Sequence, residues 1–181
     1  MFETEAELDE LQALLDASLA RSTEHLRSIV KPGERTLTAR QLMRLINGMC
    51  TLSIATVTAG GEPRISAIDG HFLHGRWFFG TSTTSAKARH LAARPAVSVS
   101  YLVGEELGVF THGHAELLNP ADGPEDPQWP SVLAHLTEHY GQSPSEWGDV
   151  AYYRLRPSWM VVFAGDPAKL LNGSTNQPSQ P

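Results

Sequence analysis

Two patterns of hydrophobic residues divide the chain near residue 48. Before that point, apolar residues recur at spacings of three and four, which predicts amphipathic helices. The clearest run is Leu8, Leu11, Leu15 and Leu19. Thr38 and Gln41 have the spacing of a capping box, which predicts a further helix directly before the change of pattern. Residues 1–48 are therefore interpreted as a helical N-terminal extension.

From Cys50 onward the period changes to two, the spacing of side chains on one face of a β-strand. Strands are predicted at 50–58, 63–69, 71–74, 76–81, 96–103, 108–118, 150–156 and 158–164. Glycines mark several of the turns between them, and Pro157 separates the last two. Short helices are predicted at 83–93 and 131–140. Many short strands with a few helices between them favour a closed, mostly antiparallel barrel over a parallel sheet.

Domain limits follow from the same pattern. The barrel domain is predicted at residues 49–165, after the N-terminal extension. Residues 166–181 are expected to be a disordered tail, because the last ten of them lack any apolar side chain. No GxGxxG motif follows a strand, so a Rossmann dinucleotide site is not predicted.

Composition narrows the classes of partner. The net charge of −6 over 181 residues disfavours broad attraction to nucleic acid or to an anionic membrane, so any anion site must be local. Cys50 is the single cysteine, which excludes an intrachain disulfide and fits a reducing compartment. The acidic first residues do not resemble a signal peptide, and no apolar run has the roughly 20 residues of a membrane span. We therefore expect a cytoplasmic protein.

Five consecutive hydroxyl-bearing residues, Thr81 to Ser85, precede Lys87 and Arg89. If a helix begins near Ser85, with Ser85 or Thr84 as its N-cap, the backbone N–H groups of its first turn face outward, where the helix dipole favours an anion. Cations in a first turn are disfavoured by roughly 0.3–1 kcal/mol each, and a bound phosphate would reverse that penalty. The segment fits a phosphate site, or alternatively an ordinary N-cap followed by two solvated cations.

Arg64 starts the second predicted strand, on the same face as Ser66 and Ile68. Two adjacent strand ends could bring it near the hydroxyl-bearing residues, where it would add a third cation. The alternative is a surface arginine on a hairpin, and the pattern leaves both interpretations open.

Taken together, these motifs resemble the pyridoxamine 5′-phosphate oxidase-like family of FMN-binding split barrels, which also contains proteins that use the deazaflavin coenzyme F420. The resemblance covers residues 40–118 and extends more weakly to 164. It is carried by TLSIATVTAGGEPRISAID (51–69) and WFFGTSTTSAKARHLAARPAVSVSY (77–101). It implies a mainly β fold, namely a six-stranded antiparallel split β-barrel with flanking helices, and a homodimer with cofactors at the interface.

The same resemblance implies a set of cofactor-binding residues. Ser85, Lys87 and Arg89 would hold the cofactor phosphate, and Ser66 with its adjacent backbone would lie along the ring system. The full set is Arg64, Ser66, Thr81, Ser82, Ser85, Lys87, Arg89 and Trp159. Trp159, Met160 or Arg156 would reach the cofactor of a partner subunit.

Two departures from the family pattern bear on activity. Members that oxidise pyridoxamine phosphate usually carry a second basic residue near position 69 and an arginine at 86, where this chain has Asp69 and Ala86. Vitamin B6 oxidation is therefore not the expected reaction. The resemblance implies an oxidoreductase that transfers a hydride between a flavin-type cofactor, F420 or FMN, and a small organic substrate.

The choice between FMN and F420 stays open. F420 carries a polyglutamate tail that would need additional cations, and six of the 14 basic residues fall between 21 and 44. This stretch could hold such a tail, or it could pair with the acidic N-terminus or be solvated, which is the preferred interpretation.

The histidines and aromatic residues suggest other functions. His112 and His114 share a strand face, a spacing able to bind a metal, but no cysteine or acidic ligand set accompanies them, and no metal is expected. His135 and His139 lack the HExxH pattern of a zinc hydrolase. Trp77, Phe78 and Phe79 are interpreted as core, and His71 and His74 as hairpin surface. The alternative function is a non-catalytic protein that binds a flavin, a deazaflavin, haem or a bilin.

Overall fold

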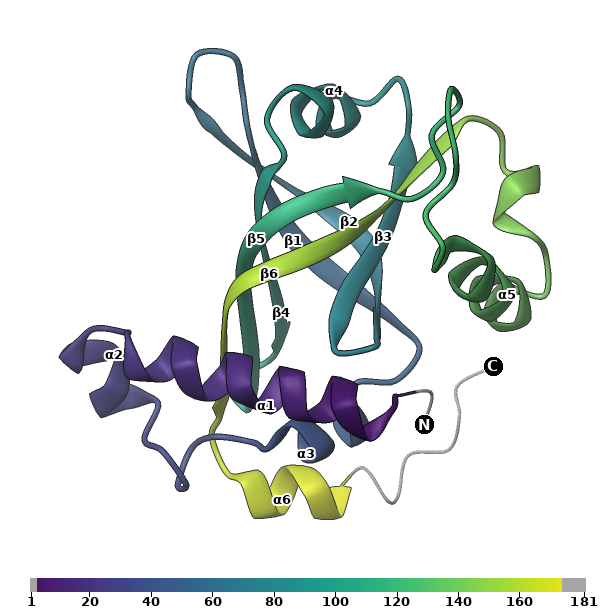
Figure 1. Ribbon diagram of the computed structural model, residues 1–181. Helices are drawn as coiled ribbons and strands as arrows, with labels where there is room; N and C mark the ends of the chain where they lie inside the picture. The colour runs from purple at the N-terminus through teal and green to yellow at the C-terminus, as the bar shows by residue number, and fades with distance from the viewer. Residues whose placement is uncertain (1–2, 174–181) are drawn as a thin grey trace.

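The computed structural model describes residues 3–173, in which six antiparallel strands close into a barrel (Figure 1). Around the barrel the strand order is β1-β2-β3-β6-β5-β4, and β1 pairs with β4 to close it. The strands are β1 Met49–Val57, β2 Pro63–Leu73, β3 Arg76–Ser82, β4 Ala96–Val103, β5 Leu107–Leu117 and β6 Val150–Ala164. This arrangement confirms the predicted six-stranded antiparallel barrel.

Helices flank the barrel at both ends and on one side. They are α1 Glu5–Ala20, α2 Glu24–Ile29, α3 Ala39–Leu45, α4 Ala86–Ala93, α5 Trp129–Tyr140 and α6 Pro167–Gly173, with a short 3-10 turn, η1, at Pro144–Glu146. The N-terminal helices and α6 lie at one end of the barrel, α4 lies at the other end beside the β1–β2 hairpin, and α5 lies against one side (Figure 1).

Two strands are longer than the sequence pattern predicts. The predicted break at Gly70 is absent, and β2 runs through this residue, which pairs with Cys50 on β1 and Phe79 on β3. A Cβ at Gly70 would lie 2.4 Å from a methyl carbon of Leu52. The glycine makes room for a core side chain and does not end the strand. Likewise β6 runs through Pro157, which pairs with Gly113 at a β-bulge where the register shifts. A Cβ at Gly113 would lie 2.1 Å from the carbonyl oxygen of Arg156, so only glycine fits.

The barrel interior is filled by alternate side chains from its strands. Leu52 and Ile54 of β1, Val109 of β5 and Leu155 of β6 have no exposed surface. Each such side chain contributes roughly 1.5–3 kcal/mol when fully buried. Trp77 and Phe79 point into this interior, whereas Phe78 points outward into a second cluster covered by α5. The prediction that all three aromatic residues belong to the core is therefore confirmed.

The N-terminal extension is fixed to the barrel by an apolar face and by polar contacts. Leu8, Leu11 and Leu15 of α1 are buried in the barrel core cluster, as the heptad-like spacing predicts. The buried hydroxyl of Ser18 accepts a hydrogen bond from the Met160 backbone N–H at 3.0 Å. The capping box at Thr38, predicted from its spacing to Gln41, is present at the start of α3.

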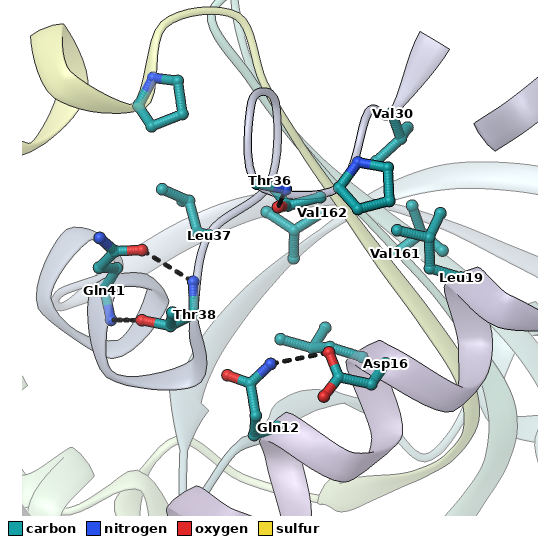
Figure 2. Close-up of a pocket in the computed structure, with 14 residues that line it drawn as sticks. Gln12, Asp16, Leu19, Val30, Thr36, Leu37, Thr38, Gln41, Val161 and Val162 are labelled. Atoms are coloured by element: carbon teal, nitrogen blue, oxygen red, sulfur yellow. Dashed lines mark hydrogen bonds between the residues drawn. The ribbon is translucent and has the colours of Figure 1, made fainter. Parts of the chain in front are cut away.

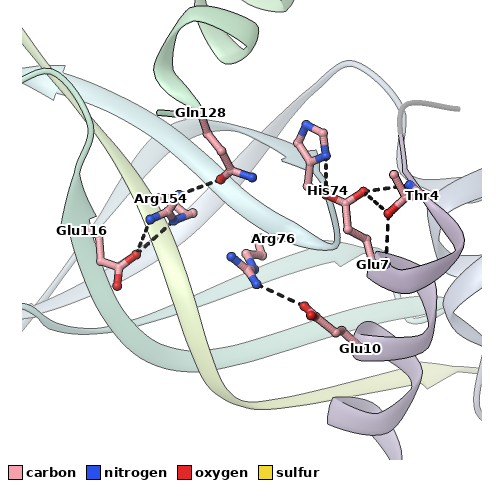
Figure 3. A network of polar contacts seen from close by, with 8 residues as sticks. All are labelled: Thr4, Glu7, Glu10, His74, Arg76, Glu116, Gln128 and Arg154. Carbon is pink, nitrogen blue, oxygen red and sulfur yellow. Dashed lines mark hydrogen bonds and ion pairs between the residues drawn. The ribbon is translucent and has the colours of Figure 1, made fainter. Parts of the chain in front are cut away.

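Polar contacts between side chains also connect the extension to the barrel (Figure 3). Glu7 of α1 contacts the imidazole of His74 at 2.9 Å, and Glu10 contacts Arg76 at 3.4 Å, so α1 is attached to the β2–β3 turn. A separate group joins the loop before α5 to the sheet: Arg154 donates to Glu116 at 2.7 Å and to Asp126 at 2.9 Å. Both groups are structural, because every member contacts another protein side chain.

The basic stretch 21–44 has mixed partners. Arg40 bonds Glu5 in the acidic N-terminal helix, and Lys31 pairs with Glu34 at 3.6 Å. Arg27 donates to the backbone carbonyls of Ala20 and Ser22. These contacts agree with the preferred interpretation of pairing and solvation. In Figure 1 the stretch lies at the end of the barrel opposite α4.

The expected tail is helical where the structure describes it. Residues 167–173 form α6, in which Asp166 accepts hydrogen bonds from the backbone N–H groups of Lys169 and Leu170. Leu170 packs against the barrel core cluster, an apolar contact that the composition of the last ten residues does not indicate. Residues 174–181 lie outside the described residues. No helix within residues 3–173 is long and apolar enough to cross a membrane.

A cavity of about 420 Å³ lies between α1, the loop before α3 and β6 (Figure 2). The side-chain amide of Gln12 donates to Asp16 at 2.9 Å and accepts from the Ala39 N–H at 2.8 Å. The amide oxygen of Gln41 accepts from the Thr38 N–H at 2.8 Å. Since these polar groups are already used within the protein, we interpret the cavity as a packing gap beneath the extension.

Candidate functional site

Strands β2 and β3 separate at the end of the barrel that carries α4. They pair only between Gly70–Leu73 and Arg76–Phe79, although β2 extends back to Pro63 and β3 extends on to Ser82. We call this gap the split. Lys87 crosses it, because its ammonium donates at 3.2 Å to the carbonyl of Ala67, a residue of β2 beyond the β2–β3 ladder. The N-terminus of α4 therefore lies beside the part of β2 that is paired with β1 but not with β3.

The hydroxyl-rich segment forms a compact turn between β3 and α4. Ser85 is the N-cap of α4, as predicted, and its hydroxyl accepts from the Ala88 N–H at 3.0 Å. The hydroxyls of Thr81 and Ser85 lie 3.1 Å apart, and those of Ser82 and Thr84 lie 2.9 Å apart. The sequence-predicted residues Thr81, Ser82 and Ser85 are thus brought together.

The first turn of α4 contains no acidic residue and includes Lys87. First-turn N–H groups have no partner within their own helix, and the dipole makes this end of a helix attractive to anions. A cation at the same place is disfavoured by the dipole unless an anion joins it. The local electrostatics therefore favour a bound anion at the turn.

Lys87 and Arg89 lie on different sides of α4, because two residues correspond to about 200° of helical rotation. Lys87 faces the split, whereas Arg89 lines a separate cavity of about 550 Å³ on the far side of the helix, together with Asn119 and Asp149. The guanidinium of Arg89 donates to the carbonyl of Thr84 at 2.7 Å. Arg89 therefore supports the turn from behind, and Lys87 is the cation that faces the split.

Arg64 and Ser66 lie on β2 near the same end of the barrel. Arg64 pairs across the ladder with Thr56, whose hydroxyl contacts His90 of α4 at 2.9 Å, so Arg64 is close to α4. Its guanidinium contacts Glu62 of the hairpin turn at 2.7 Å and is exposed. Ser66 pairs with the fully buried Ile54, which puts its side chain on the interior-facing side of β2. Because β2 is not paired with β3 here, a ligand at the split would meet the backbone edge of this segment.

Trp159 lies elsewhere on the barrel. Its ring stacks on His112 with centroids 4.7 Å apart, and its indole N–H donates to Ser22 at 3.3 Å. β3 pairs with β6 only over Val150–Arg154, and Ser82 lies opposite Val150, so Trp159 is nine residues further along β6 and does not contact the turn at 81–85 of the same chain. Met160 is fully buried, so the expectation that its side chain reaches a partner's cofactor is wrong. Arg156 is exposed and pairs with Glu116 at 3.6 Å.

A pocket of about 340 Å³ adjoins the split on the side covered by α5, and we call it the aromatic pocket. Thr81 and Ser82 belong to both the turn and the pocket wall. The remaining lining residues are Asp69, His71, Phe78, Phe79, Gly80, Leu136, Tyr140, Trp147, Val150 and Tyr152. Sequence reasoning did not find this pocket, because it forms where α5 packs across β2 and β3, which no local pattern reports.

His71 is the most unusual residue of the aromatic pocket. It is 3% exposed, so its interpretation as hairpin surface is wrong: β2 continues through it, and α5 covers it. Its Nε2 lies 3.0 Å from the Tyr140 hydroxyl, while Nδ1 has no hydrogen-bond partner among the described residues. Burial, together with nearby His139 and His135, lowers the pKa of His71 to about 4, so it is neutral at pH 7.

The hydroxyl of Tyr140 is also protonated at neutral pH, because burial and the neighbouring Asp69 raise its pKa. Within residues 3–173, no group of three or more histidine, cysteine, aspartate or glutamate side chains is arranged to hold a metal ion. His112 and His114 are exposed on β5, and His112 contacts Ser98 at 2.8 Å, which agrees with the strand-surface interpretation.

The sequence profile described as pyridoxamine 5′-phosphate oxidase matches residues 38–162. The chain belongs to this family. No curated protein matches the chain in sequence. The pyridoxamine 5′-phosphate oxidase profile spans the whole barrel, from the start of α3 to β6, and therefore includes the split, the turn and the aromatic pocket.

Solved structures of low sequence identity share the fold. The conserved hypothetical protein Rv2991 from Mycobacterium tuberculosis is 18% identical, with a TM-score of 0.58 over 82% of this chain and 94% of that one. HutZ, the haem storage protein from Vibrio cholerae, is 22% identical, with a TM-score of 0.55 over 68% and 93%. A putative pyridoxamine 5′-phosphate oxidase from Listeria innocua is 10% identical, with a TM-score of 0.53 over 68% and 95%. These likenesses establish the architecture.

Proposed function

We propose that the chain is an oxidoreductase that binds a phosphate-bearing flavin-type cofactor, FMN or F420, at the split and transfers a hydride to or from a small organic substrate. The observation that carries this proposal is the N-terminus of α4, where Ser85 caps the helix, Lys87 faces the split and no acid occupies the first turn. Membership of the pyridoxamine 5′-phosphate oxidase family supports it.

The residues at the split fit such a group. Lys87 and the first-turn N–H groups of α4 would hold the phosphate, and the hydroxyls of Thr81, Ser82 and Ser85 would accept or donate around it. Arg64 is close enough to α4 to join them by exchanging its contact with Glu62. Arg89 would position the turn through the Thr84 carbonyl.

A flavin or deazaflavin supplies the hydride acceptor or donor itself. The chain's residues would supply binding, orientation and exclusion of water. The backbone of β2 next to Ser66 and Ala67 would border the ring, and the aromatic pocket would receive the substrate. The cations of the 21–44 stretch lie at the other end of the barrel, so any hold on an F420 tail would come from a second subunit (Figure 1).

Calorimetric titration of the purified chain with FMN, riboflavin and F420 tests the proposal. Riboflavin has the ring and side chain of FMN but no phosphate, so the difference between the two isolates the phosphate site. We expect FMN or F420 to bind at micromolar concentration or tighter, and FMN to bind at least about tenfold more tightly than riboflavin if it is the cofactor. Absence of binding by both cofactors would refute the proposal.

We propose further that the chain forms a homodimer with the cofactor at its interface. The outward faces of β1, β2, β4 and β5 expose large apolar side chains, among them Ile65 at 76%, Leu102 at 56% and Phe110 at 38%. Such side chains on neighbouring strands favour association. Sedimentation equilibrium should give twice the chain mass, and Ile65→Lys with Phe110→Lys should shift it to the monomer. A monomeric wild-type chain would contradict this part of the proposal.

The second candidate is a non-catalytic flavin-, deazaflavin-, haem- or bilin-binding protein. His112 favours it, because its imidazole lies at the surface and is stacked on Trp159. The partial burial that this stacking causes lowers the pKa of His112, and the neutral imidazole is the form that binds iron. Haem titration would produce a Soret band that His112→Ala abolishes, with His25→Ala as an exposed control. No Soret band, together with tight FMN or F420 binding, would eliminate the haem candidate.

A further inference from the structure

The aromatic pocket has a charge pattern that restricts its ligand. Asp69 is the only acidic residue among its lining residues, and no lysine or arginine lines it. His71 adds no positive charge at pH 7, because burial lowers its pKa to about 4. An anionic group entering this pocket would meet a carboxylate and no cation, which is unfavourable. A cationic group would meet the carboxylate and no cationic side chain among the lining residues.

Aromatic side chains form much of the wall of the aromatic pocket. Tyr140 and Trp147 pack edge to face with centroids 4.9 Å apart at its exposed rim, and Phe78 and Tyr152 form its buried side. Aromatic faces attract cations within about 6 Å of the ring centre, and they also stack with planar ligands. A volume of about 340 Å³ lies at the lower end of the roughly 300–1,000 Å³ typical of small-molecule pockets.

A buried polar atom independently indicates a ligand. His71 is 3% exposed and lines the pocket, and its Nδ1 has no hydrogen-bond partner among the described residues. A buried, unsatisfied polar atom costs about 1–3 kcal/mol, which a ligand's polar group can offset. The other ring nitrogen is held by Tyr140 at 3.0 Å, so the imidazole has a fixed orientation.

We propose that the aromatic pocket binds the substrate and selects a small, ring-containing organic amine in its ammonium form, with Asp69 pairing the ammonium and the rings of Tyr140 and Trp147 stacking on the ligand. This inference rests on the proposed function, since it takes the pocket beside the split as the substrate site. It assigns a substrate class without phosphate or carboxylate.

Three probes that share one ring test the charge preference: phenethylamine, 2-phenylethanol and 3-phenylpropanoate. Calorimetry with the full chain, alone and saturated with whichever cofactor binds, should show phenethylamine binding at least about tenfold more tightly than the alcohol. The propanoate should not bind. Equal binding of the three, preference for the propanoate, or no binding of any probe in either state would overturn the inference.

Variants identify the recognising groups. Asp69→Asn should bring the affinity for phenethylamine to that for 2-phenylethanol, whereas Asp122→Asn, the same change in an exposed loop, should leave the preference intact. Trp147→Leu should weaken both ligands, because it removes a ring and no charge. If Asp69→Asn keeps the full preference for the amine, the inference is wrong.

The outcome also separates this inference from the proposed function. Cofactor binding without the amine preference would leave the proposed oxidoreductase intact and overturn only the substrate class. Amine selectivity in a chain that binds neither FMN nor F420 would support the pocket assignment and refute the redox function.

Discussion

The N-termini of α1 and α4 differ in the source of the negative charge that each requires. In α1 the hydroxyl of the N-cap Thr4 accepts from the Glu7 N–H at 3.3 Å, and the Glu7 carboxylate accepts from the Thr4 N–H at 2.7 Å. Glu5 lies in the same turn. In α4 the cap Ser85 is followed by no acid, and Lys87 occupies the first turn. One helix contains its own anions, and the other is electrostatically complete only with an external one.

This difference separates the two ends of the barrel by role. At the α1 end, the acidic side chains of the helix contact basic side chains of the barrel, Glu7 with His74 and Glu10 with Arg76, and so attach the helix to it. At the α4 end, the hydroxyls of the turn contact one another and Lys87 contacts a backbone carbonyl, a neutral group that an anion can replace. The comparison predicts that substitutions at the two ends affect different measurements.

The largest expected effect is on cofactor affinity in Lys87→Ala. Loss of a charge-assisted hydrogen bond, worth about 1.5–3 kcal/mol, should weaken FMN or F420 binding by roughly 10- to 150-fold. Riboflavin affinity should stay unchanged, since riboflavin has no phosphate. Lys169→Ala serves as the calorimetric control, because it removes an exposed lysine of α6 that is paired with Glu106. Wild-type affinity for the cofactor in Lys87→Ala would show that the two helix ends do not differ as described.

Removing either N-cap hydroxyl should have a smaller effect, and the two variants should differ in whether they change cofactor affinity. Thr4→Ala and Ser85→Ala should each lower the free energy of unfolding by about 1 kcal/mol, measured by urea denaturation, because each removes a cap hydrogen bond. Only Ser85→Ala should also weaken cofactor binding. If Thr4→Ala weakens binding equally, the site extends further than the turn.

Giving α4 its own anion should reverse its behaviour. Ala86 is exposed in the first turn, and Ala86→Asp should raise the free energy of unfolding of the cofactor-free protein by about 0.3–1 kcal/mol. The same variant should weaken the binding of a phosphate-bearing cofactor, whereas the uncharged Ala86→Asn should weaken it much less. Tighter FMN binding in Ala86→Asp would contradict an anion site at this turn.

The smallest expected effect concerns pH and belongs to α1. Burial alone would raise the pKa of Glu7, but the hydrogen bonds from Thr4 and the contacts with His74 outweigh it, so its pKa lies below the ordinary 4.5. A carboxyl with a lowered folded-state pKa stabilises the fold above about pH 4.5, and that stabilisation is lost as the pH falls through the folded-state value. The free energies of unfolding of the wild type and Glu7→Gln, measured in urea, should therefore differ at pH 7 and converge once the pH is below the folded-state pKa of Glu7. A constant difference would exclude this linkage.

The fold was predictable where local chemistry and tertiary structure agree. The capping box at Thr38, the N-cap at Ser85 and the alternation that buries Trp77 and Phe79 are all visible in the sequence. The errors at Gly70 and Pro157 share one cause. Both residues usually break strands, but here the first makes space for Leu52 and the second lies opposite Gly113 at a bulge, and both depend on a neighbouring strand.

The candidate site was predictable in part. The turn and Lys87 follow from local spacing, and the periodicity of α4 already implies that Arg89 lies on another face. Nothing local indicates that β2 and β3 separate after Gly70, or that α5 covers His71 and brings Tyr140 to its ring. The aromatic pocket depends on those long-range contacts, and so its residues were missed.

The short β2–β3 ladder has one further consequence. Backbone hydrogen bonds hold β2 and β3 together between Gly70–Leu73 and Arg76–Phe79, but they do not continue from Ala67 back to Pro63. There the flexible side chain of Lys87 spans the gap by its hydrogen bond to the Ala67 carbonyl. A rigid ligand that is bonded to both β2 and the N-terminus of α4 would connect them and would reduce the fluctuations of this end of the barrel. A ligand bound at this place would then stabilise the structure of the barrel in addition to any part that it takes in a reaction.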